Sequence, residues 1–457
     1  MPRKSDSAKG RHGRRGRHGG ARRRSAAQSF TETLQTTVTA LAAQGDGVAE
    51  APDGRRLFIP LTLPGDVVEV AVGPARGDGF EARVEKFIEQ APREPAFCPY
   101  FQACGGCSVQ HVPIADYREW KRDILVQALS RRGLTPEVLD LATVPNDTRR
   151  RVTFQVERRG GNKILLGFKE RRENRIVDIA SCPLLVPELN ALVPSLRELA
   201  AKMLQPTETA RMALARVVGP DGPALDLVVE RDREPDLATR EALADFAQTS
   251  GAARISWRGA DGAVEPVAHI ASVAASFEPA VVELPPGGFM QPTAEGEEIL
   301  RDAVVAGAKG AERIAELYSG AGTFTMALAK IAHVYAVDGD PALSRALSTG
   351  AGRSRMGGRV TVETRDLAAR PLLPGELEGF DTVVLDPPRA GALRQVEQIV
   401  ATPGVRRVVM VSCNPQTFAR DMRILVTAGF KPGPVLPVDQ FPYSHHLECV
   451  TTLIRGF

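Results

Sequence analysis

Cysteine spacing is the first feature of this chain that could support chemistry. Three of its six cysteines, Cys98, Cys104 and Cys107, fall within the segment FCPYFQACGGCSVQH, and Cys182 stands alone further along the chain. So long a chain with six cysteines is no disulfide scaffold, and a tight cluster in a reducing compartment indicates a metal site or catalysis. One structural zinc ion is the simplest interpretation, although closed zinc sites more often show two C-x2-C pairs and this segment has one.

Cys413 has a different setting, in the sequence VVMVSCNPQTF. The apolar run predicts a buried strand that ends at this cysteine, and Pro415 favours a helix that begins just after it. The thiolate is the attacking form of cysteine, and helix N-termini stabilise it. We therefore interpret Cys413 as a nucleophile, the alternative being a small apolar side chain that ends a core strand.

Carboxylates mark the ends of other expected strands. In FDTVVLDPPRAG, Asp386 precedes two prolines, which fix the backbone and make a rigid acidic turn. Methyltransferases that modify exocyclic amino groups use a similar motif followed by an aromatic residue, whereas Arg389 follows here. In FPYSHHLECV, Glu448 precedes the last expected strand, and beside a nucleophile it is a candidate general base. We assign no role to His445 or His446.

A glycine-rich turn follows the first strand of the same region, in AELYSGAGTFT. Gly320 and Gly322 remove side chains where the backbone would approach a ligand, but the third glycine of a dinucleotide fingerprint is missing. The next strand, VYAVD, ends in Asp338, and a carboxylate there commonly holds a ribose by its hydroxyls. Alone, Asp338 would be interpreted as a cap of the following helix. The two features together predict a site for a nucleoside-containing cofactor.

Strands and helices alternate from about residue 293 onward. This pattern predicts an open parallel sheet with helices on both faces, and ligands bind such sheets at the carboxyl ends of the strands. Cys413, Asp386 and Asp338 each follow or end a strand of this sheet, so we expect them at one edge.

The first half of the chain has other patterns. Residues 32–90 contain five short strand-like runs separated by turns, which is typical of a small closed barrel such as the OB-fold. Residues 93–280 predict an antiparallel sheet with flanking helices.

Residues 1–24 carry a net charge of +9, whereas the formal net charge of the whole chain is +3, so the rest of the chain is acidic. We expect this tail to be disordered, either as a solubilising extension or as an RNA-binding arm.

Length and composition narrow the class of protein. A chain of 457 residues is expected to form two to four domains. It has no apolar run of about 18 residues and no pattern of a secretory signal. We therefore expect a cytoplasmic protein without a membrane span.

Several motifs together resemble a known family. SCNPQTFARD, LDPPRAG, LYSGAGTFT, FMQPTAEG and FPYSHHLE are similar to motifs of the S-adenosylmethionine-dependent RNA uracil-5 methyltransferases. CPYFQACGGCSVQH resembles the iron–sulfur branch, whose best-known member acts on 23S ribosomal RNA. The resemblance implies a multidomain α/β protein. Its expected parts are a basic tail (1–28), a TRAM barrel of the OB-fold type (29–92), a mixed α+β iron–sulfur domain (93–284) and a Rossmann-like class I methyltransferase domain (285–457).

The same resemblance implies roles for individual residues. Thr323 and Thr293 stand where the family often has Asn, which makes the cofactor contact of Thr323 less secure. A 4Fe–4S cluster would be held by Cys98, Cys104, Cys107 and Cys182. S-adenosylmethionine would be bound by Gln291, Tyr318, Gly320, Gly322, Thr323, Asp338, Asp366 and Asp386.

These expectations combine into one reaction. Cys413 would attack carbon-6 of a uracil, carbon-5 would take the methyl group, and Glu448 would remove the carbon-5 proton before elimination. The expected substrate is 23S ribosomal RNA, with tRNA as the alternative, and the protein is expected to be a monomer.

Three rival hypotheses remain at this point. A cytosine-5 methyltransferase would need an acid partner for the cytosine ring nitrogen, and no matching motif is found. A non-catalytic RNA-binding protein of ribosome assembly is disfavoured by the intact Cys413 and Glu448. An iron–sulfur redox protein would need a second cofactor motif.

Overall fold

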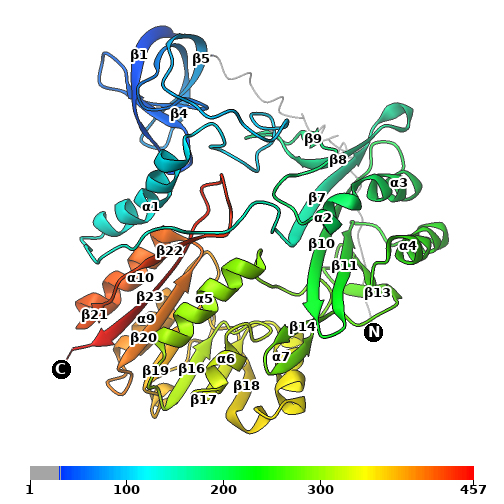
Figure 1. Cartoon of the computed structure of the whole chain (residues 1–457), viewed down its shortest axis with the longest axis vertical. Helices are drawn as coiled ribbons and strands as arrows, with labels where there is room; N and C mark the ends of the chain where they lie inside the picture. Colours follow the sequence, from blue (N-terminus) through cyan, green and yellow to red (C-terminus); the bar gives the residue numbers. More distant parts are fainter. Residues whose placement is uncertain (1–29, 31, 457) are drawn as a thin grey trace, which may run out of the picture.

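The computed structural model describes residue 30 and residues 32–456. The expected basic tail, residues 1–28, lies outside the described residues. Figure 1 shows three β-rich parts: a barrel at the top, a large sheet on the right, and an α/β unit at the lower left. No helix in the described part of the chain is long and apolar enough to cross a membrane.

The N-terminal part is a closed five-stranded barrel, as the strand spacing predicted. Its strands alternate buried and exposed side chains, because successive residues of a strand point to opposite faces. Val38, Leu57 and Val70 are among the apolar side chains that fill its interior. The order around the barrel is β1 (Glu32–Leu41), β2 (Gly47–Glu50), β3 (Arg56–Ile59), β5 (Gly79–Glu89) and β4 (Val67–Arg76).

The middle part is a seven-stranded sheet that two longer helices cover. Its strand pairs are antiparallel, as expected, except for one parallel pair, β11 with β12, whose connection contains a helix. The helices are α3 (Val193–Met203) and α4 (Leu237–Ser250), and the short α2 (Pro187–Ala191) precedes α3. The strand order is β13 (Val264–His269), β12 (Arg254–Arg258), β11 (Gly222–Glu230), β10 (Thr209–Gly219), β7 (Arg151–Arg158), β8 (Ile164–Lys169) and β9 (Ile176–Asp178).

A second sheet forms the α/β unit. Eight of its nine strands come from the C-terminal segment, and five of these alternate with helices in the expected βαβ pattern. The five strands β18, β17, β16, β19 and β20 run parallel to one another, which confirms the expected parallel sheet. Strand β23 runs antiparallel to both of its neighbours, β20 and β22. The short connection 440–447 explains this, because a parallel strand would need a longer crossover. The order is β18 (Val360–Thr364), β17 (His333–Asp338), β16 (Arg313–Leu317), β19 (Thr382–Leu385), β20 (Arg407–Ser412), β23 (Glu448–Arg455), β22 (Leu436–Asp439) and β6 (Ala142–Thr143), with β21 (Phe430–Pro432) beside β23.

Helices pack on this sheet in two apolar clusters. One cluster contains buried residues of α5 and α7 and of the hairpin β14–β15, and the other contains residues of α1, α9 and α10. Helix α1, strand β6 and the hairpin β14–β15 lie within the range expected for the central domain, and α1 lies beside α10 (Figure 1). The remaining bounds are α1 (Ile114–Ser130), β14 (Ala274–Phe277), β15 (Ala280–Glu283), α5 (Ala294–Gly307), α6 (Thr325–Ala329), α7 (Pro341–Arg353), α8 (Pro374–Leu377), α9 (Leu393–Val400), α10 (Pro415–Thr427) and the short turns η1 (Gly160–Asn162) and η2 (Gly357–Arg359).

Candidate active site

The structure places Cys413 and Glu448 opposite each other. Cys413 directly follows β20, and Glu448 is the first residue of β23. These strands pair antiparallel with Ser412 opposite Cys449, so the same register sets Cys413 opposite Glu448. Directly opposed residues in an antiparallel pair project their side chains to the same face. A thiol and a carboxylate from distant parts of the sequence therefore meet at the carboxyl edge of the sheet.

The surroundings of Cys413 favour the thiol over the thiolate. Burial, together with the charges of Glu448 and Asp386, raises the pKa of Cys413 to about 11, while Arg389 acts in the opposite direction. The helix α10 begins at Pro415, as predicted, but its cap is Asn414, whose Oδ1 accepts a hydrogen bond from the Gln416 N–H at 3.1 Å. The stabilisation expected from the helix N-terminus is thus outweighed by burial and two carboxylates.

The two carboxyl groups near this thiol are also perturbed. Burial raises the pKa of Glu448 to about 8, with a further contribution from Asp386. Burial likewise raises the pKa of Asp386 to about 7. Both groups therefore exchange protons near neutral pH, which is the property a general acid or base requires.

The acidic turn that carries Asp386 is fastened to the helix behind Cys413. Asn414 Nδ2 donates a hydrogen bond to the Arg389 carbonyl at 2.9 Å, and the Asp421 Oδ2 atom accepts one from the Ala392 N–H at 2.7 Å. Gly391 has a φ of +76°, and a Cβ there would lie 2.6 Å from side-chain atoms of α10. The proline turn and the nucleophile loop therefore form one rigid unit.

The glycine-rich turn faces Asp338, as the sequence suggested. Gly320 N–H donates to Asp338 Oδ2 at 2.8 Å, so this carboxylate lies across the turn. The helix cap is a different residue, Asp340, which accepts from two N–H groups of α7. At Gly320 a Cβ would meet no atom of the described residues within 4 Å, whereas at Gly322 it would lie 2.5 Å from Leu347. Gly320 thus borders open space for a ligand, and Gly322 serves packing.

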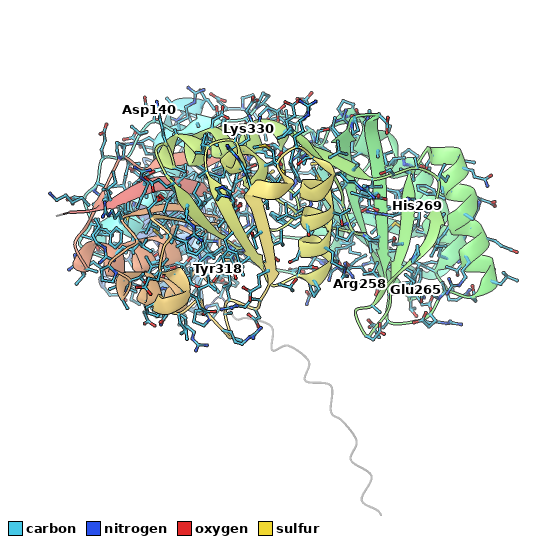
Figure 2. The ribbon with its side chains drawn as sticks, turned by 90° about the horizontal axis from the view of Figure 1, so that it is seen from below. Asp140, Arg258, Glu265, His269, Tyr318 and Lys330 are labelled. Atoms are coloured by element: carbon cyan, nitrogen blue, oxygen red, sulfur yellow. The ribbon has the colours of Figure 1, made fainter. Side chains whose placement is uncertain are left out.

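Tyr318, the residue after β16, adopts a φ of +68°. Figure 2 shows Tyr318 at one end of the strands of the α/β unit and Lys330 at the opposite end, which places Tyr318 at the carboxyl edge of this sheet. Burial raises the pKa of Tyr318 to about 12, so its hydroxyl stays protonated. Thr323 is half-buried in the same turn.

The remaining residues that the family resemblance named already make hydrogen bonds within the protein. Gln291 is buried, and its Oε1 accepts a hydrogen bond from Gln440 Nε2 at 3.0 Å. Gln440 follows β22, whose carboxyl end lies at the same edge, and the sequence analysis did not single it out. Thr293, which replaces a frequent Asn, caps α5. Asp366 is exposed, and its Oδ1 accepts from the N–H groups of the two alanines at 368 and 369.

Glu316 is a second residue that the sequence analysis missed. It lies inside β16 with an exposed fraction of 2%, and neither carboxylate oxygen has a hydrogen-bond partner among the described residues. Burial raises its pKa to about 8, helped by Asp386 and Asp338. The available signal was the charge between the apolar residues Ala315 and Leu317 of the run RIAEL. Glu316 extends the set of acidic groups beneath the glycine turn.

The four cysteines of the other motif line one cavity of about 370 Å³, which we call the cysteine cavity. They are Cys98, Cys104, Cys107 and Cys182, all in the free thiol form and half-buried. Burial raises the pKa of Cys104 and Cys182 and raises that of Cys107 to about 12. Within residues 30 and 32–456, no three His, Cys, Asp or Glu side chains converge as ligands of one metal ion. The structure thus brings the four thiols together without showing a metal centre.

The chemistry of this cavity fits a group that binds several thiolates. The positive charges of Arg149 and Arg171 oppose the rise in the cysteine pKa values, at Cys182 and Cys104 respectively. The Gly106 N–H also donates to the Cys104 sulfur at 3.4 Å.

The cysteine segment also holds the loop that leads to Glu448. Ser108 N–H donates to the Tyr443 carbonyl at 2.7 Å, and Phe441, His445 and His446 line the cysteine cavity. Burial lowers the pKa of both histidines, that of His446 to about 4, so neither is a cation at neutral pH.

A buried ion pair fixes the start of the same loop. Lys121 Nζ of α1 lies 2.7 Å from Asp439 Oδ1, and both side chains are almost fully buried. The Tyr117 hydroxyl donates to the other Asp439 oxygen. Lys121 also donates to the carbonyls of Phe441 and Ser444 at 3.1 and 2.7 Å. Helix α1 therefore holds the segment from which Glu448 extends.

The strand order, the glycine turn and the acidic strand ends define a class I S-adenosylmethionine-dependent methyltransferase. A structure of the tRNA (uracil-54, C5)-methyltransferase of Pyrococcus abyssi, in complex with S-adenosyl-L-homocysteine, shares this fold. Its TM-score is 0.69 with 23% sequence identity, and the match covers 92% of this chain and all of that one.

Sequence relatives narrow the class. A sequence model of the tRNA (Uracil-5-)-methyltransferase family matches residues 376–456. An uncharacterized RNA methyltransferase of Caulobacter vibrioides is 40% identical over 92% of this chain and 99% of its own length. The 23S rRNA (uracil(1939)-C(5))-methyltransferase RlmD of Pectobacterium atrosepticum is 32% identical over 93% of this chain and 94% of its own. The chain belongs to the RNA uracil-5 methyltransferase family.

Proposed function

We propose that this protein methylates carbon-5 of a uridine in RNA through a covalent bond to Cys413. The register that sets the Cys413 thiol opposite the Glu448 carboxylate, beside Asp386, carries the proposal. S-adenosylmethionine supplies the methyl group.

Each residue at the sheet edge has a distinct task in this reaction. Cys413 reacts as the thiolate and forms a bond to carbon-6 of the uracil, which makes carbon-5 nucleophilic. After methyl transfer, ionised Glu448 takes the proton from carbon-5, and the bond to Cys413 breaks. Asp338 and the open face of Gly320 position the cofactor, and Gln291, Tyr318, Thr323, Asp366 and Asp386 complete its site. A uracil can reach this edge only when it is unstacked, as in a loop or after flipping.

The substrate we propose is 23S ribosomal RNA, with tRNA as the second candidate. The Pectobacterium relative, named for action on 23S rRNA, aligns along almost the whole chain and supports the first. The name of the matching family model supports the second. In this proposal the barrel binds RNA, as TRAM barrels do, and one chain suffices for activity.

We also propose that Cys98, Cys104, Cys107 and Cys182 hold a 4Fe–4S cluster. The support is that all four line one cavity, beside two arginines whose positive charge favours thiolates. The cluster's contribution would be structural, since these cysteines border the loop before Glu448.

Mass-spectrometric mapping of 5-methyluridine tests the proposed function. Ribosomal and transfer RNA from a strain that lacks the gene should miss this modification at one uridine, and the complemented strain should regain it. If both RNA classes keep every 5-methyluridine, the proposed activity is wrong.

A further inference from the structure

A second cavity, of about 640 Å³, lies between the barrel and the cysteine segment, and we call it the barrel cavity. Its walls include Leu61 and Phe87 from the barrel, Arg93 from the linker, and Phe101 and His111 from the cysteine segment. Neither Cys413 nor Glu448 borders it. The reaction described above therefore does not account for this space.

His111 is a polar side chain of this wall whose ring nitrogens are buried without hydrogen-bond partners among the described residues. Its side chain has an exposed fraction of 7%, and neither ring nitrogen has a hydrogen-bond partner within the described part of the chain. Burial, with Arg93 and Arg171 nearby, lowers the pKa of His111 to about 4. The neutral ring offers one donor and one acceptor, and leaving both unpaired costs free energy that a bound polar edge would offset.

Flat apolar and cationic surfaces surround this imidazole. The Phe101 ring centroid lies 5.5 Å from that of His111. The Arg93 guanidinium lies over the Phe87 ring at 4.9 Å, and its Nη2 atom is 2.5 Å from the buried Asp66 carboxylate. Aromatic rings and guanidinium planes are the surfaces on which single-stranded bases stack.

The rim of the cavity carries charges of both signs. Arg83 and Arg172 border it, and Arg172 also pairs with the buried Asp46 carboxylate at 2.5 Å. Glu81 lies 3.5 Å from Arg172, and Glu94 accepts a hydrogen bond from the Ile114 N–H at 3.2 Å. The barrel cavity and the cysteine cavity share Phe101 in their walls, so the two cavities are neighbours.

We propose that the barrel cavity binds one unpaired nucleotide of the RNA substrate, with its base among Phe87 and Phe101 and its edge hydrogen-bonded to His111. This inference rests on the proposed function for the identity of the ligand. It adds a second recognition point, so that RNA is selected by two unstacked nucleotides, the target uridine and this one.

The test measures RNA binding in the full chain carrying Cys413→Ala, with protein-free ribosomal RNA from a strain that lacks the gene as the probe. His111→Phe keeps the ring and removes both nitrogens, and Ala96→Trp fills the cavity from an exposed loop position. Ala260→Trp, at an exposed turn outside the cavity, is the matched control. Each cavity variant should weaken RNA binding about tenfold, within the range measured for a stacked base, and the control should not.

Ultraviolet crosslinking of the same complex should attach a nucleotide to Phe87, Phe101 or His111. Cofactor binding, measured separately, confirms that each variant is folded. If the cavity variants bind RNA like the control, or no crosslink maps to the cavity, the inference is wrong even where methylation proceeds. If crosslinks map to the cavity but wild-type protein forms no 5-methyluridine, the proposed function fails and the cavity assignment stands.

Discussion

The cysteine cavity and the Cys413 site both bury thiols, but their neighbours carry opposite charge. Around the cysteine cavity, Arg149 and Arg171 favour ionisation. Beside Cys413, the carboxyl groups of Glu448 and Asp386 oppose it. A site that holds thiolates gains from nearby cations, whereas the carboxyl groups beside Cys413 disfavour the thiolate that attacks, so the thiol must give up its proton before or during attack. The two proposed thiol sites therefore differ in the charge of their neighbours, although burial raises the cysteine pKa at both.

The largest effect should come from removing the transient nucleophile. Cys413→Ala should lower the methylation rate by roughly 10⁴-fold or more, as removal of a covalent nucleophile does in other enzymes. Binding of S-adenosylmethionine, measured by calorimetry, should persist, because the glycine turn and Asp338 are unchanged. Residual turnover near the wild-type rate would contradict a covalent role for Cys413.

The next largest effect is expected for Glu448, which lies opposite Cys413 on the neighbouring strand. Glu448→Gln should slow turnover by about 10²–10⁴-fold, the usual contribution of a general base. Attack and methyl transfer should still occur, so a methylated protein–RNA adduct should accumulate on a denaturing gel with labelled RNA. Cys413→Ala should form no such adduct. Normal turnover by Glu448→Gln would mean that another base acts.

Substitution of one cysteine in the cysteine cavity should lower the iron content and the stability of the protein. Anaerobically purified wild-type protein should contain about four irons per chain. Cys107→Ser should lose most of this iron and lower the melting temperature by several degrees, while Cys449→Ser, a matched buried thiol outside the cavity, keeps the iron. Stoichiometric zinc without sulfide would contradict the proposed cluster.

The smallest expected effect is a pH dependence of protein stability caused by Glu448, beside Cys413. The folded-state pKa of Glu448, about 8, lies above its ordinary value of 4.5, so wild-type stability should fall as pH rises between them. Glu448→Gln removes this penalty, because the neutral amide does not ionise. The variant should therefore gain melting temperature over wild type at pH 8, and less at pH 5. Glu316→Gln should show the same trend, and the exposed Glu241→Gln should show none.

Sequence patterns predicted the barrel, the βαβ order and the strand-end positions of Cys413 and Asp386, because these depend on local periodicity and turn residues. They placed Glu448 beside Cys413 as a candidate general base, but not directly opposite it, since this depends on the antiparallel register of β23. Gln291 was named from the family resemblance, whereas its partner Gln440 was missed, because the two meet only after distant segments pack. The effect of burial on the Cys413 pKa also required the fold.

The ion pair between Lys121 and Asp439 bears on how this enzyme can be divided. A fragment beginning at residue 285 would keep Cys413, Glu448 and the cofactor turn, yet it would lose α1 and β6. Asp439 would then lose its cation together with the helix that covers it, and an edge of the sheet would be exposed. A smaller working catalyst would therefore have to retain residues 114–143.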